Sequence, residues 1–280
     1  MKKLYCFIIG LFLTFAMVSP SYALVLPIKL AYGSIKYTAY SATQRYANFE
    51  AVTLNNTCSY NWDVSNTYVV TFMLDGDPTP YAHDAVLTQT GSSVLGSGGY
   101  PAGGPHTYAW DVTSGTVTGN NIGLNVLYNL GAPGTVMTMT GTIAPNGSMS
   151  GTWTDNFGGT RTGTWVTTSG TAAKTFGSGC TGKGIFSYHD GDKNYYVVNV
   201  KYVNFSGNKV WFAGPVVIGN IGTGSWLFAE AQDVANPNGG GMDKVWGSFT
   251  TEAAAKLGVA TMSDPADGPF TILTGNLKVQ

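Results

Sequence analysis

The sequence has few charged side chains. Only 10% of its 280 residues are Asp, Glu, Lys or Arg, whereas an average soluble domain has roughly 25%. The formal net charge is −1 at pH 7, and Arg45 and Arg161 are the only arginines. Proteins that bind nucleic acid present clustered basic side chains on one face. The composition therefore argues against nucleic acid as a partner.

Reactive side chains are scarce as well. The only histidines are His83, His106 and His189, and none has a second histidine at metal-ligand spacing. No Gly-x-Ser-x-Gly nucleophile elbow occurs. We therefore expect no catalytic residues, no metal and no cofactor, and a protein that is not an enzyme. Carboxylates brought together by folding are the one catalytic arrangement that the sequence leaves open.

Two motif matches fail on their context. The segment 177–182 fits the letters of a dinucleotide-binding fingerprint, but it follows no expected strand and opens no helix. The acidic turn that begins at Asp190 has Tyr195 where a calcium-binding EF-hand loop needs glycine. An ordinary Asp-Gly turn is the simpler interpretation.

Long apolar runs are confined to the N-terminus. Lys2 and Lys3 precede an apolar run over residues 4–18, and small residues follow up to Ala23. This order is typical of a secretory signal peptide, and the run is shorter than the about 20 residues that span a bilayer. A membrane anchor is the alternative. We expect cleavage near Ala23, no membrane span afterwards, and export from a bacterial cell to the periplasm, the cell surface or the medium.

What is abundant is β-strand signal. From Thr67 onward, short alternating runs rich in Thr, Val, Tyr and Trp are separated at intervals of roughly ten residues by Gly, Asn, Asp or Pro. Turns such as Asn146-Gly147 supply the positive φ angles of tight hairpins. Their shortness leaves no room for crossover helices, so neighbouring strands pair antiparallel. This pattern predicts an all-β protein with two small antiparallel barrels or barrel-like domains in tandem.

The expected domains follow from changes in this texture. The first barrel is an up-and-down meander of about eight strands, and the second β-rich domain contains one short helix, capped by Thr250 or Thr251 and ended by Gly258. The predicted division is a signal peptide at 1–23, a segment of uncertain structure at 24–56, the first barrel at 57–168, a linker at 169–181 and the second domain at 182–280.

Cys58 and Cys180 remain after cleavage, in a compartment that permits disulfides. Closing an even-stranded meander brings its two ends together, so we predict a bond between these cysteines at the seam of the first barrel. Two buried thiols are the alternative, because spacing alone does not determine pairing.

The first domain also resembles a known group of proteins. Over roughly residues 57–170 its strand rhythm is similar to uncharacterised extracytoplasmic bacterial modules whose meander barrel is like that of avidin and the lipocalins. The lipocalin pattern has a Gly-x-Trp near the beginning of the domain, whereas the Gly-x-Trp pairs of this sequence lie in the last two expected strands. The resemblance therefore implies a fold, and no ligand-binding residues can be carried over from it. The segments that carry it are 99–105, 118–121, 141–143, 147–153 and 163–165.

A candidate site emerges from the last hairpin of this domain. If Asp155 faces Arg161, then Trp153 lies over Gly163 and Trp165 over Gly151, all on one face. A second stripe on another strand carries the remaining aromatic candidates. We predict an aromatic cup walled by Tyr108, Trp110, Trp153 and Trp165, with Asp155 and Arg161 at its mouth. A core filled by these side chains is the alternative.

Two functions are consistent with these features. The preferred hypothesis is a secreted, non-enzymatic interaction or structural module that meets an unknown extracellular partner. The alternative is a carrier that holds a small apolar or aromatic ligand inside the first barrel, which requires a pocket of about 300 Å³ or more.

Overall fold

The computed structural model describes residues 29–38, 44–54, 57–234 and 243–279. Strands dominate these ranges, as expected, and one helix accompanies them. Within them no helix is long and apolar enough to cross a membrane. The N-terminal apolar run and the expected cleavage position near Ala23 lie outside the described residues.

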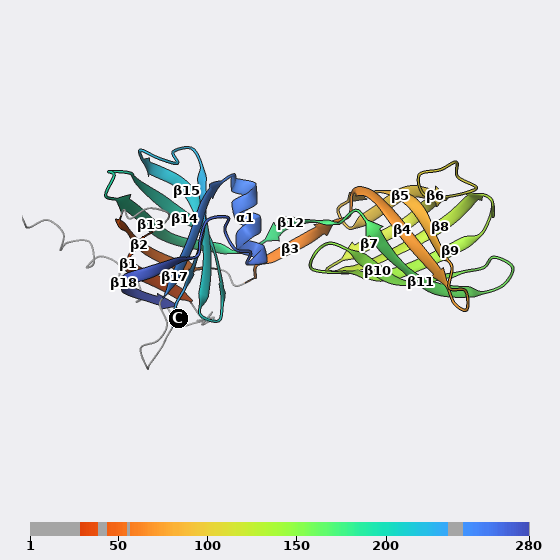
Figure 1. Ribbon diagram of the computed structural model, residues 1–280, viewed down its shortest axis with the longest axis horizontal. Helices are drawn as coiled ribbons and strands as arrows, with labels where there is room; N and C mark the ends of the chain where they lie inside the picture. Colours follow the sequence, from red (N-terminus) through yellow and green to blue (C-terminus); the bar gives the residue numbers. More distant parts are fainter. Residues whose placement is uncertain (1–28, 39–43, 55–56, 235–242, 280) are drawn as a thin grey trace, which may run out of the picture.

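Residues 66–169 form a closed antiparallel barrel, which we call the head barrel (Figure 1). Its strands follow chain order, and the last strand closes against the first. Tight hairpins with glycines at positive φ, such as Gly134 and Gly147 at 84° and 86°, join them. The predicted eight-stranded meander is confirmed. The strands are β4 (Asn66–Leu74), β5 (Pro80–Thr90), β6 (Ser93–Tyr100), β7 (Tyr108–Thr118), β8 (Asn121–Leu130), β9 (Val136–Ile143), β10 (Met149–Asp155) and β11 (Arg161–Ser169).

A second closed barrel, the base barrel, is built from both ends of the chain. Its first two strands form a hairpin that fits between the first and last of the C-terminal strands. Its strands are β1 (Leu30–Thr38), β2 (Gln44–Thr53), β13 (Thr181–Asp190), β14 (Tyr195–Ser206), β15 (Lys209–Gly219), β16 (Trp226–Gln232), β17 (Lys244–Thr250) and β18 (Phe270–Val279).

The tandem arrangement therefore needs a correction: the head barrel is inserted between β2 and β13 of the base barrel. Residues 24–56, which the sequence left unassigned, supply two strands of the base barrel. In one such contact, Ser187 Oγ donates to the carbonyl oxygen of Asn48, 139 residues away. Local alternation of side chains predicts that a strand exists and does not predict a partner at this distance.

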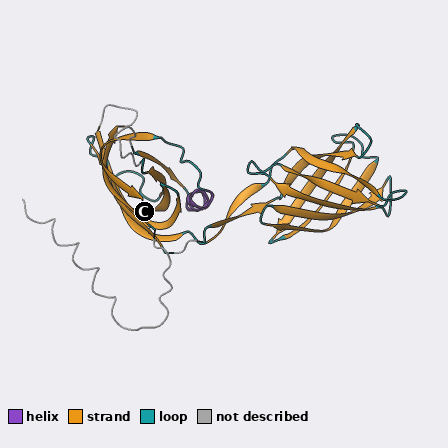
Figure 2. Ribbon diagram, turned by 90° about the horizontal axis from the view of Figure 1, so that it is seen from below, coloured by secondary structure: helices purple, strands orange, loops and turns teal. Residues whose placement is uncertain are grey.

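A two-stranded ribbon joins the barrels, which lie at its opposite ends (Figures 1 and 2). It pairs β3 (Ser59–Asp63) with β12 (Ala173–Ser178), so the expected linker at 169–181 contains a strand. Trp62 of the ribbon is buried in the core of the head barrel, and Phe176 packs against the outer face of the base barrel. The ribbon is therefore anchored by apolar burial at each end.

The predicted disulfide between Cys58 and Cys180 is confirmed, but it lies elsewhere than expected. It closes the ribbon beside the Ser59–Ser178 pair, at the side of the base barrel. The seam of the head barrel is closed by the strand pairing of β4 with β11 instead. The bond was expected at the wrong place because the first barrel was expected to begin at residue 57. The two cysteines flank the ribbon strands β3 and β12 and not the strands of the barrel.

The helix α1 (Glu252–Thr261) begins as expected, since Thr251 Oγ accepts a hydrogen bond of 3.3 Å from the backbone N–H of Ala254. It does not end at Gly258, as the sequence suggested; Met262 caps it at φ 53°. Gly258 faces the sheet, where an added Cβ would lie 2.6 Å from the ring of Phe228. This glycine therefore permits close packing of the helix on the barrel.

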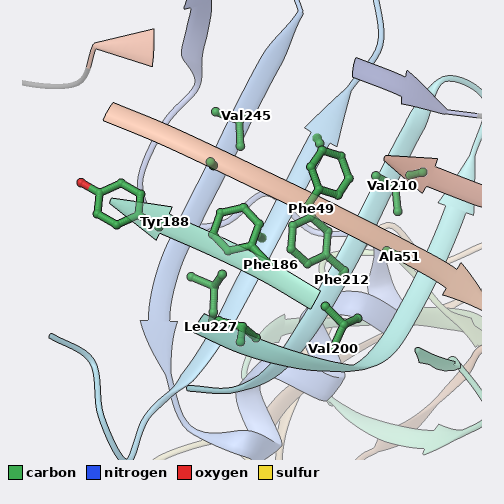
Figure 3. Close-up of a cluster of buried hydrophobic side chains, with 14 of the residues drawn as sticks. Phe49, Ala51, Phe186, Tyr188, Val200, Val210, Phe212, Leu227 and Val245 are labelled. Carbon is green, nitrogen blue, oxygen red and sulfur yellow. The ribbon is translucent and has the colours of Figure 1, made fainter. Parts of the chain in front are cut away.

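Each barrel has its own apolar core. In the base barrel, Phe49 stacks on Phe212 with ring centroids 5.5 Å apart, and Phe186 lies at the same distance from Phe212 (Figure 3). Separate cores of this kind are the signature of two folding domains. The division of the molecule into a head and a base therefore reflects its packing as well as its connectivity.

Candidate functional site

The last hairpin of the head barrel has the register that the sequence predicted. Trp153 pairs with Gly163 and Trp165 with Gly151, and Asp155 faces Arg161. Both indoles are buried on the inner face. A Cβ on Gly163 would lie 2.8 Å from the Trp153 ring, so glycine is what lets this indole lie flat across the neighbouring strand.

Trp110 and Trp165 lie in the apolar core of the head barrel and are not among the residues that line the cavity at its mouth. Trp165 reaches past its paired glycine to Gly141, where an added Cβ would lie 2.5 Å from the ring. Trp110 is 2% exposed, and its Nε1–H donates to Nδ1 of His83 at 3.1 Å. These two rings therefore form a packed layer below the mouth.

Above this packed layer, the barrel opens into a cavity of about 240 Å³, which we call the distal cup. Aromatic side chains make most of its wall, and an ion pair lies at its rim. Its lining residues are Phe72, Leu74, Tyr81, His83, Tyr100, Tyr108, Tyr128, Ala132, Thr135, Met137, Trp153, Asp155, Phe157 and Arg161.

Of the six residues proposed from the sequence, Tyr108, Trp153, Asp155 and Arg161 line this cup. The other two are the buried tryptophans of the core. The structure thus brings the rim pair and two of the expected walls together at one end of the barrel.

At the rim, Asp155 and Arg161 form an ion pair joined by two hydrogen bonds. Arg161 donates from Nε to Oδ1 of Asp155 at 2.9 Å and from Nη2 to Oδ2 at 2.5 Å. The Asp155 side chain is only 2% exposed, while that of Arg161 is 38% exposed. The hydrogen bond to Asp155 raises the pKa of Arg161, and the guanidinium also lies 4.6 Å above the ring of Phe157. Each charge is therefore neutralised before any ligand arrives.

Sequence reasoning missed Tyr81, Tyr100 and Tyr128, which complete the wall beside the expected Tyr108. Tyr81, Tyr100, Tyr108 and Tyr128 form a chain of ring contacts with centroids 5.8 to 6.4 Å apart. Burial raises the pKa of Tyr128 to about 12, so its hydroxyl stays protonated at neutral pH. Their place at strand ends is the sequence signal that could have found these residues. In an up-and-down barrel, the end of one strand and the start of the next lie at the same opening.

His83 adds a polar group to the wall of the cup. Burial lowers the pKa of this histidine to about 4, so the ring is neutral at pH 7. Because Nδ1 accepts the hydrogen bond from Trp110, the proton of the neutral ring resides on Nε2. The ring therefore offers the cup a fixed tautomer with one N–H donor.

The cup faces away from the rest of the molecule. Its residues lie at the end of β4, β6, β8 and β10 and at the start of β5, β7, β9 and β11. The ribbon, by contrast, joins the start of β4 and the end of β11. The strand ends that surround the cup lie at the tip of the head barrel, on the side away from the ribbon and the base barrel (Figures 1 and 2).

The acidic turn at Asp190 is an ordinary turn. Its Oδ1 accepts from the backbone N–H groups of Asp192 and Asn194, and its Oδ2 accepts from Tyr188 and from the Asn194 side chain. No cluster of three or more His, Cys, Asp or Glu with metal-ligand geometry occurs among the described residues.

Comparison with protein-family models, curated proteins and solved structures finds no match to this chain. Function is therefore inferred from the site itself.

Proposed function

We propose that the protein is a secreted, non-enzymatic binding module whose distal cup takes up a small uncharged ring, apolar or aromatic, that projects from an extracellular partner. The observation that carries this proposal is the open aromatic cup of about 240 Å³ at the tip of the head barrel. The base barrel and the ribbon act as the support that presents this tip.

The size of the cup favours recognition of a projecting ring over transport of a whole molecule. Pockets that enclose a free ligand of ordinary size have volumes of roughly 300–1,000 Å³, and the distal cup at about 240 Å³ is smaller. The space suits one ring, while the remainder of the partner stays outside. The alternative, a carrier for a small free ligand, shares the same aromatic wall and is distinguished by experiment below.

The charge balance favours an uncharged ligand. Asp155 binds Arg161 through two hydrogen bonds, so neither group offers an unpaired charge to a ligand. The tyrosine rings present apolar faces with a polar hydroxyl at one end, which suits a ring that carries a hydroxyl or amide group. Affinity would come from buried ring area and direction from the hydroxyls and His83.

Export is part of the proposal. The N-terminal signal-like segment and the resemblance to extracytoplasmic barrels support it, and the disulfide between Cys58 and Cys180 is compatible with an oxidising compartment.

A fluorescence titration tests the proposal. Phenol and cyclohexanol serve as probes, because each is a small uncharged ring. Trp153 lies in the wall of the cup, so its fluorescence reports on binding. Tyr108→Ala removes one wall, and Tyr60→Ala in the ribbon is the matched control, since both tyrosines are 38% exposed. We expect saturable binding by the parent, about tenfold weaker binding by Tyr108→Ala, and unchanged binding by Tyr60→Ala. Absence of saturable binding, or equal loss in the two variants, would contradict the proposal.

A tailed probe separates ring recognition from transport. A phenol joined through its oxygen to a soluble poly(ethylene glycol) chain should bind within a few-fold of free phenyl methyl ether if the cup recognises a projecting ring. If the tail abolishes binding while the free ether still binds, the cup encloses its ligand and the carrier alternative is favoured.

A further inference from the structure

We propose that the base barrel has a second, separate binding site, which takes a small carboxylate with a compact apolar body. The site is a cavity of about 190 Å³ whose lining includes Tyr37, Arg45, Tyr188 and Tyr196. It is independent of the distal cup in position and in charge.

The cavity opens at the end of the base barrel that faces away from the ribbon. Tyr37 lies near the end of β1 and Arg45 near the start of β2. Tyr188 and Tyr196 flank the turn between β13 and β14. The ribbon, in contrast, is reached from the end of β2 and leads back to the start of β13. The two cavities therefore lie in different barrels and share no lining residue.

Arg45 lacks the partner that Arg161 has. Among the described residues, no ion pair joins Arg45 to a carboxylate. Its side chain interacts with the hydroxyl of Tyr37, and its buried Nε has no hydrogen-bond partner in the described part of the chain. A buried donor without an acceptor is unfavourable. A bound carboxylate would supply the missing acceptor, and a guanidinium can hold it through two hydrogen bonds.

Asp190 does not fill this role. It pairs with Arg45 across β13 and β2, but its two carboxylate oxygens accept four hydrogen bonds from Tyr188 and from its own turn. The Asp190 carboxylate is thus committed to holding the turn.

The remaining wall defines the body of the ligand. Tyr188 and Tyr196 stack with ring centroids 4.8 Å apart, and Phe186, Leu227 and Val245 form apolar lining. Burial raises the pKa of Tyr37 to about 12 and raises the pKa of Tyr196 well above its usual value. These hydroxyls therefore remain protonated donors toward an anion, and the rings offer area to an apolar group.

One negative charge fits better than two. The cavity contains a single guanidinium, and Asp267 also belongs to its lining. A dianion such as phosphate would be attracted by Arg45 and repelled by Asp267. A monocarboxylate bearing one ring or a short branched chain matches both the charge and the volume.

Isothermal titration of the full chain with benzoate and with benzamide tests this site, and both titrations are made in the Tyr108→Ala background, because the intact distal cup would itself take the uncharged ring of benzamide. The two probes have nearly the same shape, and only benzoate is charged. We expect benzoate to bind about tenfold more tightly than benzamide, and Arg45→Gln to remove that preference. Lys36→Gln is the matched control: it deletes one positive charge beside the same mouth, on a side chain next to the inward-facing Tyr37, and should keep the preference.

Two further variants make the test decisive. Tyr37→Phe removes only a hydroxyl and should weaken benzoate binding several-fold, so the proposal stays testable if Arg45→Gln does not fold. Tyr108→Ala in the distal cup should leave benzoate binding unchanged, which separates this site from the proposed function. Equal affinity for both probes, no saturable benzoate binding, loss in Tyr108→Ala, or unchanged binding in both Tyr37→Phe and a folded Arg45→Gln would each overturn the proposal.

Discussion

Trp153 lies flat across Gly163, its direct partner on the neighbouring strand, and its Nε1–H donates to the carbonyl oxygen of Thr164 at 3.1 Å. A side chain on Gly163 would meet both the indole and the backbone oxygen of Met73. The contact therefore depends on glycine, and it holds the indole where it forms one wall of the distal cup.

Gly163→Val should destabilise the head barrel by about 1 to 3 kcal/mol, because the added side chain overfills a packed interior. Denaturant unfolding followed by tryptophan emission measures the change. Thr164→Val, at the adjacent exposed position, should alter the free energy of unfolding by less than about 0.5 kcal/mol. An unchanged unfolding midpoint for Gly163→Val would show that the indole does not occupy this place.

The disulfide should be present in the protein produced in an oxidising compartment and should stabilise it. A bond between cysteines separated by 122 residues contributes about 5 kcal/mol in the chain-entropy model. Intact mass after alkylation, with and without prior reduction, counts the free thiols, and unfolding under both conditions measures the stability. Two alkylated cysteines in the unreduced mature protein would rule the bond out.

Lys209 should be essential to the base barrel at neutral pH. Its Nζ lies 2.7 Å from Oε1 of the fully buried Glu230, between the rings of Trp211 and Trp246. Removing one partner of a buried pair typically costs about 3 to 5 kcal/mol, so Lys209→Met should lower the free energy of unfolding by that amount.

Acidification should partly restore the Lys209→Met variant, because a protonated Glu230 needs no cation. Burial already raises the pKa of Glu230 in the parent. A raised carboxyl pKa means that the folded state holds its proton more tightly than the unfolded state, so this group favours folding at low pH and opposes it as pH rises. Lys256→Met breaks a more exposed pair, in which the side chains of Lys256 and Glu252 are 25% and 50% exposed, and should cost about 1 kcal/mol or less. Equal effects of the two substitutions would contradict this account.

His83 should make the head barrel sensitive to mild acid. Its pKa in the folded protein is about 4, lowered by burial from 6.5. The unfolded state therefore binds a proton that the folded state excludes. The stabilisation is complete above about pH 6.5 and is lost as pH falls toward 4, by an amount on the order of 3 kcal/mol. Unfolding of the parent and of His83→Gln across this range isolates the effect as the difference between them. Parallel pH profiles would contradict it.

The head barrel was predictable because its information is local. Alternating side chains mark each strand, and residues such as Gly134 and Gly147 mark the turns, so chain order alone gives the sheet order. The base barrel was not, because β1 and β2 pair with strands from the far end of the chain. Nothing in residues 30–53 specifies a partner so distant.

The site was predictable to the extent that strand register determines it. Pairing Asp155 with Arg161 fixed the positions of both tryptophans in the hairpin. Which of them lines the cup could not be predicted, because that depends on depth along the barrel axis: Trp153 lies near the mouth, while Trp165 lies deeper in the packed layer. Tyr100 and Tyr128 are not fixed by the register of this hairpin, and only their place near the ends of β6 and β8 indicates that they lie at the mouth.

If the distal cup binds a small uncharged ring, as we propose, the indole N–H signals of the seven tryptophans should report where the ring lies. In an NMR titration with phenol, assigned through Trp153→Phe, the Trp153 signal should shift saturably while those of Trp211 and Trp226 in the base barrel stay in place. A Trp153 signal that does not move, or that moves no more than the others, would contradict this proposal.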